Sequence, residues 1–216
     1  MQQHVKHDRP HQEGARLDRV RLNEIVTLMA FGGRRRRVYT RITALSGAGP
    51  GDRVLDIGCG GGYLARLLSA AVGPDGRVTG IDPSAAAVSY AERRAPANCS
   101  FAVGVAQSLD LPDQSFDVVT STLAAHHIPR QELAAAFGEM FRVLRPGGAL
   151  LAADFRPGGR RHTPHAIASA RRHGSAVPLE ELATAAGFSS RLAVSCRCCG
   201  TFGPSGHWAR LRQPEG

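Results

Sequence analysis

Short apolar segments alternate with helical patterns along the middle of the chain. Five segments of mainly apolar or β-branched residues read as strands: RVLDI, RVTGI, CSFAVGV, FDVVTST and ALLAAD. Between them, apolar residues recur every three or four positions, which predicts helices over residues 61–71, 84–94 and 130–144. Strands separated by helices in this way are typical of a doubly wound, mostly parallel sheet. The pattern therefore predicts an α/β fold.

Further elements are expected around this alternation. Helical spacing is present over residues 17–29 and 38–45, ahead of the first strand, and LEELATAAGF predicts a short helix near the other end. A Pro-Gly-Gly turn at residues 146–148 is expected before ALLAAD. Two strand-like segments, SRLAVSCRCC and GHWARLRQ, are joined by a short link, which is most simply an antiparallel hairpin. We therefore expect one antiparallel strand at this end of the sheet.

The composition is that of a globular chain. The sequence has 216 residues, 43% of them hydrophobic, and no apolar run approaches the ~20 residues that a membrane span needs. The N-terminal stretch MQQHVKHDRPHQEGARLDR is polar and lacks the apolar centre of a signal peptide. We therefore expect a single domain, no membrane and a cytoplasmic location. The five cysteines are odd in number and irregularly spaced, so no disulfide framework is predicted.

The net charge of +9 raises the question of a nucleic-acid partner. Of the 27 basic residues only Lys6 is a lysine, and so strong a preference for arginine, beside many alanines and glycines, indicates biased codon usage. The densest cluster, Arg34–Arg37, is most simply the solvated start of a helix or a loop. A nucleic-acid partner is therefore not expected.

The stretch VLDIGCGGGYLARLL, residues 54–68, places a glycine-rich loop between the first strand and the first helix. A dinucleotide site would need glycines in the pattern G-x-G-x-x-G. Gly58 and Gly60 fit its first two positions, but Tyr63 occupies the third. The pattern that fits instead is D-x-G-x-G-x-G, from Asp56 to Gly62. An acidic residue ahead of the loop would repel a pyrophosphate and suits a ligand that carries an ammonium or a sulfonium.

A second acidic residue, Asp82, ends the strand RVTGI and begins the sequence DPS. A carboxylate at the end of the strand next to a glycine loop accepts the hydroxyl protons of a ribose in nucleotide sites. Together with Asp56, it predicts a site for a ribose and an amino-acid cation without a phosphate.

Four motifs in this order resemble the class I S-adenosylmethionine-dependent methyltransferases: VLDIGCGGG, VTGIDPS, LPDQSFDVVTSTLAAHHI and EMFRVLRPGGALLAADF. The resemblance is strongest to the small-molecule branch that includes ubiquinone/menaquinone-biosynthesis methyltransferases. It implies a seven-stranded sheet of order 3-2-1-4-5-7-6 with strand 7 antiparallel. It also implies S-adenosylmethionine as methyl donor, with S-adenosylhomocysteine as product. Residues 46–216 would form the cofactor-binding domain, and residues 1–45 a tail and helices that cover the site.

The resemblance also assigns cofactor-binding residues. They are Asp56, Gly58, Cys59, Gly60, Asp82, Pro83, Ala106, Gln107 and Thr122. Asp56 and the loop backbone would hold the methionine end, Asp82 the ribose, and Pro83 the adenine. The chain departs from the family at Val105, where an acidic residue usually receives the adenine amino group. The backbone N–H of Ala106 and the side-chain amide of Gln107 would then take over part of that role.

His126 and His127 are the candidate catalytic residues, because they follow the fourth strand in STLAAHHIP and histidine titrates near neutral pH. A base is needed when the acceptor loses a proton on methylation. The alternative is that one of them packs against or caps the following helix. Asp154, at the end of the fifth strand, is a weaker candidate by the same positional argument.

Two further clusters give no functional prediction. The cysteines of CRCCG lack the spacing of zinc ligands, so no metal is expected. The arginines of residues 156–174 could bind an acidic substrate but are as well explained by a solvated face; they are Arg160, Arg161, Arg171 and Arg172. The prediction is methyl transfer to a small molecule by a monomer or homodimer, with the accepting atom left open among O, N, C and S. The alternatives are an RNA methyltransferase and a cofactor-binding scaffold without methyl transfer.

Overall fold

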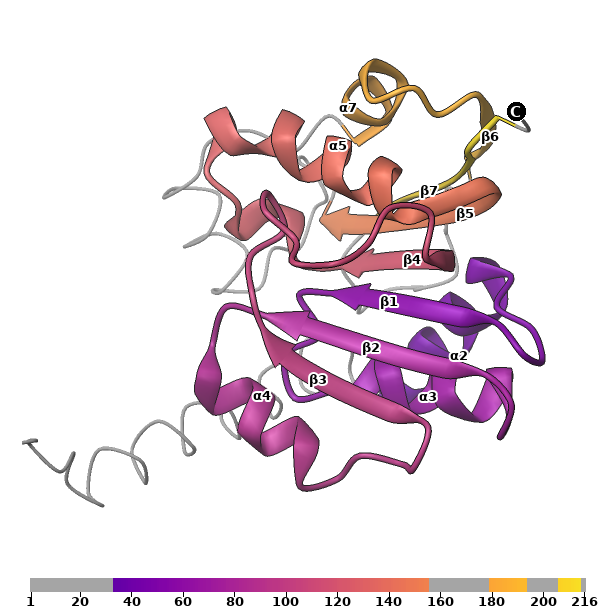
Figure 1. Cartoon of the computed structure of the whole chain (residues 1–216), viewed down its shortest axis with the longest axis vertical. Coiled ribbons are helices and arrows are strands. Elements are labelled where there is room, and N and C mark those ends of the chain that lie inside the picture. The colour runs from indigo at the N-terminus through magenta and orange to yellow at the C-terminus, as the bar shows by residue number, and fades with distance from the viewer. Residues whose placement is uncertain (1–32, 156–178, 194–205, 215–216) are drawn as a thin grey trace, which may run out of the picture.

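A seven-stranded sheet runs through the residues that this computed structural model describes, which are 33–155, 179–193 and 206–214 (Figure 1). The strands are β1 (Arg53–Ile57), β2 (Arg77–Asp82), β3 (Cys99–Val103), β4 (Phe116–Thr122), β5 (Leu144–Phe155), β6 (Ser190–Ala193) and β7 (Gly206–Arg212). Their order is β3-β2-β1-β4-β5-β7-β6. The strands β1 to β5 are parallel, whereas β7 is antiparallel to both β5 and β6. The predicted sheet, its order and its C-terminal hairpin are confirmed.

Helices cover both faces of this sheet (Figure 1). One face carries α2 (Arg35–Ser46), α3 (Tyr63–Val72) and α4 (Ala85–Glu92), and the other carries α5 (Leu133–Val143) and α7 (Leu179–Ala185). Two short 3-10 helices, η1 (Ala125–His127) and η2 (Arg130–Glu132), lie between β4 and α5. Successive strand residues face opposite sides, so Val54 packs beneath α2 and α3 while Leu55 packs on the α5 side.

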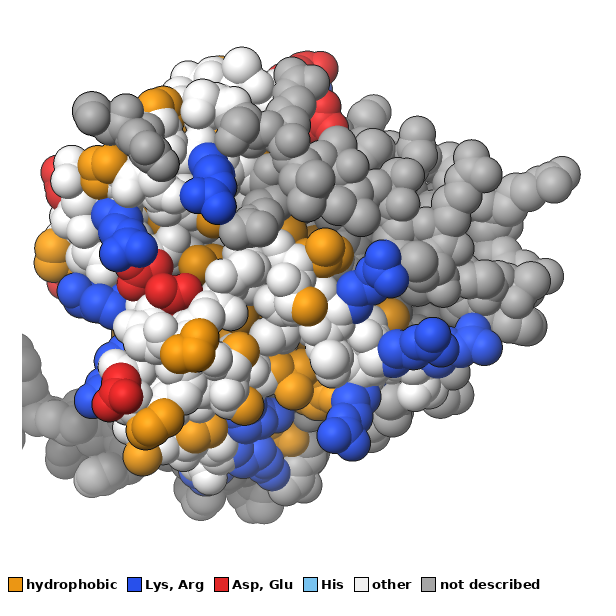
Figure 2. Space-filling view, turned by 90° about the vertical axis from the view of Figure 1, so that its right-hand side faces the viewer, with side chains coloured by type: hydrophobic (Ala, Val, Ile, Leu, Met, Phe, Trp, Pro, Cys, Tyr) orange, Lys and Arg blue, Asp and Glu red, His pale blue; other side chains and the backbone are white. Residues whose placement is uncertain are grey.

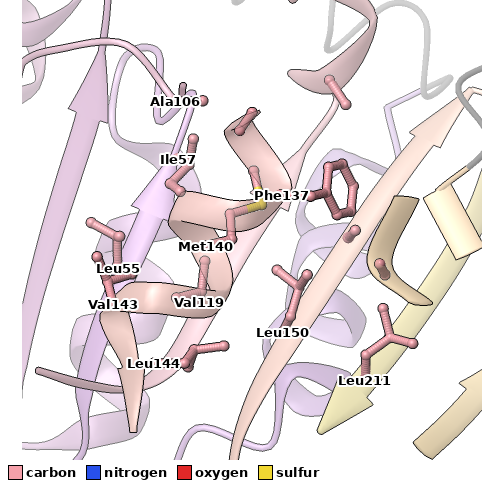
Figure 3. Packing of buried hydrophobic residues seen from close by; sticks show 14 of the residues in the cluster. Leu55, Ile57, Ala106, Val119, Phe137, Met140, Val143, Leu144, Leu150 and Leu211 are labelled. Carbon is pink, nitrogen blue, oxygen red and sulfur yellow. The ribbon is translucent and has the colours of Figure 1, made fainter. Parts of the chain in front are cut away.

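The core on the α5 side shows how the helix is held on the sheet (Figure 3). Phe137, Met140 and Val143 recur every three residues of α5 and are buried. They pack with Val119 of β4 and Leu150 of β5. Burying one large apolar side chain stabilises a protein by about 1.5–3 kcal/mol, so this apolar face fixes α5 on the centre of the sheet.

Two helices begin later than their sequence patterns predicted. The helix α3 begins at Tyr63 rather than at residue 61, because Gly62 has a φ of 73° and belongs to the preceding loop. The helix α5 begins at Leu133, since residues 130–132 form η2. Both corrections lie at the ends of loops, where local spacing does not set the boundary.

The predicted Pro-Gly-Gly turn is wrong, since residues 146–148 lie within β5. Leu144 pairs with Phe116 of β4, and pairing resumes with Ala149 opposite Val118. The residues between them form a bulge. On the side of β5 away from β4, this bulge is held by backbone hydrogen bonds. Gln213 accepts a hydrogen bond from the Gly147 N–H at 3.2 Å and donates to the Gly148 carbonyl at 2.9 Å.

Arg34–Arg37 is the start of a helix, as predicted, with Arg34 at the cap of α2. Arg36 and Arg37 are exposed. Arg35 is half-buried, and its guanidinium carbon lies 4.0 Å from the centre of the Tyr63 ring. Because a cation over an aromatic ring is a stabilising contact, Arg35 joins α2 to the start of α3.

Further arginines lie at the edge where the parallel strands begin, onto which Figure 2 looks. Arg53 and Arg77 open β1 and β2 and pair in register, and Arg145 and Arg212 lie near the start of β5 and at the end of β7. All four are exposed. Blue side chains are spread over this face with other surface between them rather than forming one stripe (Figure 2). None of the helices in the described part of the chain has the length and apolar character to cross a membrane.

The loop between β3 and β4 is tied to α5 by one arginine. The Arg142 guanidinium donates to both carboxylate oxygens of Glu139, at 2.7 and 2.9 Å, and to Asp113 Oδ1 at 2.5 Å. It also donates to the carbonyls of Leu109 and Leu111, at 3.0 and 2.8 Å. The hydrogen bond from Arg142 is the main reason that the pKa of Glu139 lies below its usual value. The guanidinium therefore forms hydrogen bonds with the loop and with α5 at the same time.

Replacing Arg142 by lysine is expected to lower the free energy of unfolding by about 2–3 kcal/mol, because one ammonium group cannot replace the fork of five N–H donors. Urea unfolding followed by circular dichroism measures this change. The matched control is Arg130→Lys, at an exposed position, which should change the free energy of unfolding by less than about 0.5 kcal/mol. Equal stability of the two variants would show that the link to the loop is not stabilising.

Candidate functional site

The glycine loop between β1 and α3 is held by backbone hydrogen bonds to β2. The N–H groups of Gly58 and Cys59 both donate to the Ile81 carbonyl in β2, at 2.8 and 3.1 Å. Gly58 and Gly60 have φ values of 71° and 51°, a conformation that favours glycine. A Cβ at Gly58 would lie 2.2 Å from the Cβ of Ala124. The loop therefore touches the segment after β4 at a point where no larger residue fits.

This geometry changes the predicted role of the loop backbone. The Gly60 N–H donates to Asp82 Oδ2 at 2.9 Å, so the N–H groups of Gly58, Cys59 and Gly60 are all engaged within the protein. The loop can therefore contact a ligand through the surface of its glycines and through its carbonyl oxygens, but not through these three N–H groups. The Cys59 thiol is buried in the core beside Leu64, and burial raises its pKa far above the usual value, so it packs as a neutral group.

Asp56, at the end of β1, has a carboxyl group that is only half satisfied. It is 2% exposed, and its Oδ1 accepts a hydrogen bond from the Thr120 hydroxyl at 2.8 Å. Its Oδ2 is buried and accepts no hydrogen bond from any residue that the structure describes. Burial raises the pKa of Asp56 to about 7, against the effect of the Thr120 hydrogen bond. A buried carboxylate oxygen without a partner suits a cationic ligand group.

Thr122 adds a second polar atom on the same face of the sheet. Thr120 meets Asp56 across the β1–β4 pair, and Thr122, two residues further along β4, points to the same side. The Thr122 Oγ1 atom is also buried without a hydrogen bond to the described part of the chain. Two neighbouring strands thus carry, near their ends, an acceptor and a hydroxyl that the described residues leave unpaired.

Asp82, at the end of β2, is held in a fixed orientation. Its Oδ2 accepts from the Gly60 N–H and its Oδ1 from the Ser84 N–H, both at 2.9 Å. Ser84 caps α4, since its hydroxyl accepts from the Ala87 N–H at 3.3 Å. Each carboxylate oxygen keeps a further lone pair, which matches the two hydroxyls of a ribose.

The residues predicted to lie near adenine follow β2 and β3. Pro83 is exposed beside Asp82, and Ala106 is buried. The Gln107 amide nitrogen donates to Glu132 Oε2 at 2.5 Å, so this amide is engaged toward the start of α5. Val105 is 38% exposed.

The predicted histidines lie in η1, directly after β4. The His126 Nδ1 atom lies 2.8 Å from Asp154 Oδ1, and the His126 backbone N–H donates to Asp154 Oδ2 at 2.9 Å. Asp154 is 3% exposed and the His126 side chain 14% exposed. His127 is exposed, and its ring centre lies 4.0 Å from that of His126. The sequence suggested Asp154 only by its position, and the structure joins it to His126 as a dyad.

The backbone bends sharply between Thr122 and this dyad. Leu123 has a φ of 55°, which residues other than glycine rarely adopt, and its N–H donates to the Ala153 carbonyl at 2.8 Å. Asp154 follows Ala152 on the α5 side of the sheet, the side opposite to Asp56. The bend at Leu123 therefore carries the chain from one face of the sheet to the other.

Some sequence predictions fall outside the described residues. These are the cysteines of CRCCG and the four arginines of residues 156–174. Within the described ranges, no group of three or more His, Cys, Asp or Glu side chains could hold a metal ion.

Comparison with known proteins identifies the domain. Residues 54–148 match the family model described as a methyltransferase domain. That stretch contains the glycine loop, Asp82 and the histidines. Residues 54–148 thus form a methyltransferase domain.

Two curated relatives are similar to part of this chain. The 2-methyl-6-phytyl-1,4-hydroquinone methyltransferase of Synechocystis sp. is 41% identical over 117 residues, which are 53% of this chain and 36% of that protein. The ubiquinone/menaquinone biosynthesis C-methyltransferase UbiE of Ectopseudomonas mendocina is 38% identical over 129 residues, 56% of this chain and 50% of that protein. The chain thus spans half or less of the length of these relatives.

Two solved structures share the fold of this chain. A SAM dependent methyltransferase from Aquifex aeolicus superposes with a TM-score of 0.65 at 22% identity, covering 80% of this chain and 89% of that one. The [4+2]-cyclase SpnF superposes with a TM-score of 0.64 at 24% identity, covering 83% and 81%. At such identities the likeness concerns the fold alone.

Proposed function

We propose that the chain transfers a methyl group from S-adenosylmethionine to a small molecule whose acceptor group gives up a proton. The observation that carries this proposal is the dyad of His126 and Asp154. Ala124, two residues before His126, is in contact with the glycine loop at Gly58. A base held this close to the cofactor loop is what an acceptor needs when it loses a proton on methylation.

The described residues fit the parts of the cofactor. When bound, S-adenosylmethionine supplies a methyl group activated by its sulfonium. Asp56 Oδ2 and Thr122 Oγ1, buried without described partners, would accept from its ammonium group. Asp82, fixed by two backbone N–H groups, would accept from the ribose hydroxyls. An ammonium at Asp56 offsets the cost of burying that carboxylate.

The dyad explains how the chain would handle the acceptor proton. When the His126 Nδ1–H donates to Asp154, Nε2 is the basic nitrogen of the neutral ring. Asp154 fixes this tautomer and the ring orientation, and its negative charge stabilises the imidazolium that forms when Nε2 takes the proton. Asp154 is thus a positioning residue, and His126 is the proposed base. The exposed ring of His127 packs beside it.

The acceptor class that fits best is an aromatic compound with ionisable hydroxyls. The name of one relative specifies a 1,4-hydroquinone as its substrate. A hydroquinone matches the dyad, because loss of a hydroxyl proton makes both the oxygen and the ring carbons stronger nucleophiles. We therefore propose a hydroquinone-like acceptor.

Two other functions are distinguished by experiment. The [4+2]-cyclase SpnF, by its name, uses this fold for a different reaction, so a scaffold that binds the cofactor without methyl transfer is the first alternative. It predicts cofactor binding with no methylated product from a hydroquinone. An RNA methyltransferase is the second, and it predicts RNA binding that weakens steeply with salt. The cytoplasmic location and the monomeric or dimeric state stay predictions.

Calorimetric titration with S-adenosylmethionine and S-adenosylhomocysteine tests the cofactor site. Asp82→Ala is expected to weaken both affinities about 100-fold, because two hydrogen bonds to a charged acceptor are lost. Asp75→Ala, in the exposed turn before β2, is the matched control and should leave both affinities unchanged. Failure of the wild type to bind either form would refute the proposal, and unchanged binding by Asp82→Ala would remove that residue from the site.

A further inference from the structure

The side chains beside Asp82 on the β3 side carry no hydrogen-bonding atoms. Asp82 lies opposite Val103 in the β2–β3 pair, and the Gly104 N–H donates to the Asp82 carbonyl at 3.2 Å. Val105 follows in a turn that is closed by a hydrogen bond from the Ser108 N–H to the Val105 carbonyl at 3.3 Å. A base attached to a ribose at Asp82 would therefore meet glycine and valine on this side.

The two valines are exposed far beyond what is usual for large apolar side chains in this chain. Val103 is 58% exposed and Val105 is 38% exposed. They are the exposed large hydrophobic side chains among the described residues. Apolar surface left open next to a nucleoside site is suited to packing against a flat ring. This surface offers contact area to a ring but no hydrogen-bonding group.

The nearest side-chain amide is engaged by another residue through its nitrogen. The Gln107 amide nitrogen donates to Glu132 Oε2 at 2.5 Å, across to the residue before α5. This hydrogen bond orients the amide toward Glu132. The direction of this side chain is thus set by a contact within the protein through its nitrogen.

We infer that the purine of the cofactor is held by apolar packing against Val105, without a side-chain acceptor for its 6-amino group. The chain would then accept sulfonium cofactors whose purine lacks or modifies that amino group. The inference rests on the proposed placement of the ribose at Asp82 and names a specificity of the same site. It makes Val105 the residue that sets base selectivity.

The test compares S-adenosylhomocysteine with its analogue in which hydrogen replaces the 6-amino group of the purine. Both are titrated calorimetrically into the wild-type full chain. We expect the two dissociation constants to agree within about threefold, since no hydrogen bond to a side chain is lost. Val105→Asp should instead prefer S-adenosylhomocysteine by about tenfold or more, because a carboxylate then accepts from the 6-amino group.

Two further variants make the outcomes decisive. Val105→Leu keeps the position apolar and should retain the equal affinities of the wild type, and Gln107→Leu should do the same. A tenfold wild-type preference for S-adenosylhomocysteine that Gln107→Leu removes would overturn the inference and assign the acceptor to Gln107. No gain of preference in Val105→Asp would place Val105 away from the base and overturn it as well. If S-adenosylhomocysteine itself does not bind, the proposed cofactor site fails and the inference fails with it.

Discussion

Replacing His126 by alanine is expected to lower the turnover number for a hydroquinone acceptor about 100- to 1,000-fold while leaving the affinity for S-adenosylmethionine unchanged. A general base typically contributes about 10²- to 10⁴-fold to a rate, and the His126 ring contacts Asp154 and His127. Steady-state assays of methylated product, beside calorimetric titration of the cofactor, separate the two effects.

Asp154→Asn is expected to lower turnover by a smaller factor, about 10- to 100-fold, because the ring keeps its place but loses the charge that stabilises the imidazolium. His127→Ala is the matched control, since the neighbouring ring is exposed. It should change turnover less than about threefold. Full activity of His126→Ala would exclude the dyad from the reaction.

Replacing Asp56 by asparagine is expected to make the protein more stable above pH 7 and unable to bind its cofactor well. Burial holds the pKa of Asp56 at about 7 in the folded chain, against an ordinary value of 3.8 for an aspartate. Between these values the folded state binds more protons than the unfolded state, so the contribution of Asp56 to stability falls as pH rises through this window. Above pH 7 the ionised carboxylate costs a few kcal/mol, which asparagine avoids while still accepting from Thr120.

The same carboxylate is expected to make cofactor binding depend on pH. An ammonium group pairs with the ionised form of Asp56, so the affinity for S-adenosylmethionine should fall as pH drops below about 7. Asp56→Asn should bind about 100-fold more weakly at pH 8 and show a flatter pH dependence. Thermal unfolding and calorimetry at pH 5, 7 and 8 measure both properties. Lower stability of Asp56→Asn than of the wild type at pH 8 would contradict this account.

Much of the proposed cofactor site follows from the sequence because its determinants are local. The strands are short apolar runs, and the D-x-G-x-G-x-G pattern fixes Asp56, the loop and the start of α3 within one stretch. Asp82 was predictable because parallel strands bring their carboxyl ends to one edge. Even here the N–H groups of the glycine loop differ from their expected role of holding the methionine end. They donate instead to Ile81 and Asp82, which come from the next strand.

The pairs that join distant segments could not be predicted from spacing. His126 and Asp154 meet only because β4 and β5 are neighbours and the bend at Leu123 turns the chain across the sheet. The engagement of Gln107 by Glu132 likewise depends on how η2 docks beside the loop after β3. The bulge in β5 was not predicted, because Pro-Gly-Gly is a strong local turn signal. The pairing of β5 with β4 on one side and β7 on the other overrides that signal.

The strained residue Leu123 has a consequence for how the site would adapt to new substrates. A left-handed leucine costs about 1–2 kcal/mol, and the fold meets that cost once, when the chain folds, rather than at each reaction cycle. The distance between the donor loop and the base is thereby built into the central strands and is insensitive to whatever occupies the acceptor side. Laboratory evolution toward other acceptors should therefore retain the Thr122–His126 segment and accumulate its changes elsewhere, whereas Leu123→Gly would relax the segment and loosen the alignment on which every acceptor depends.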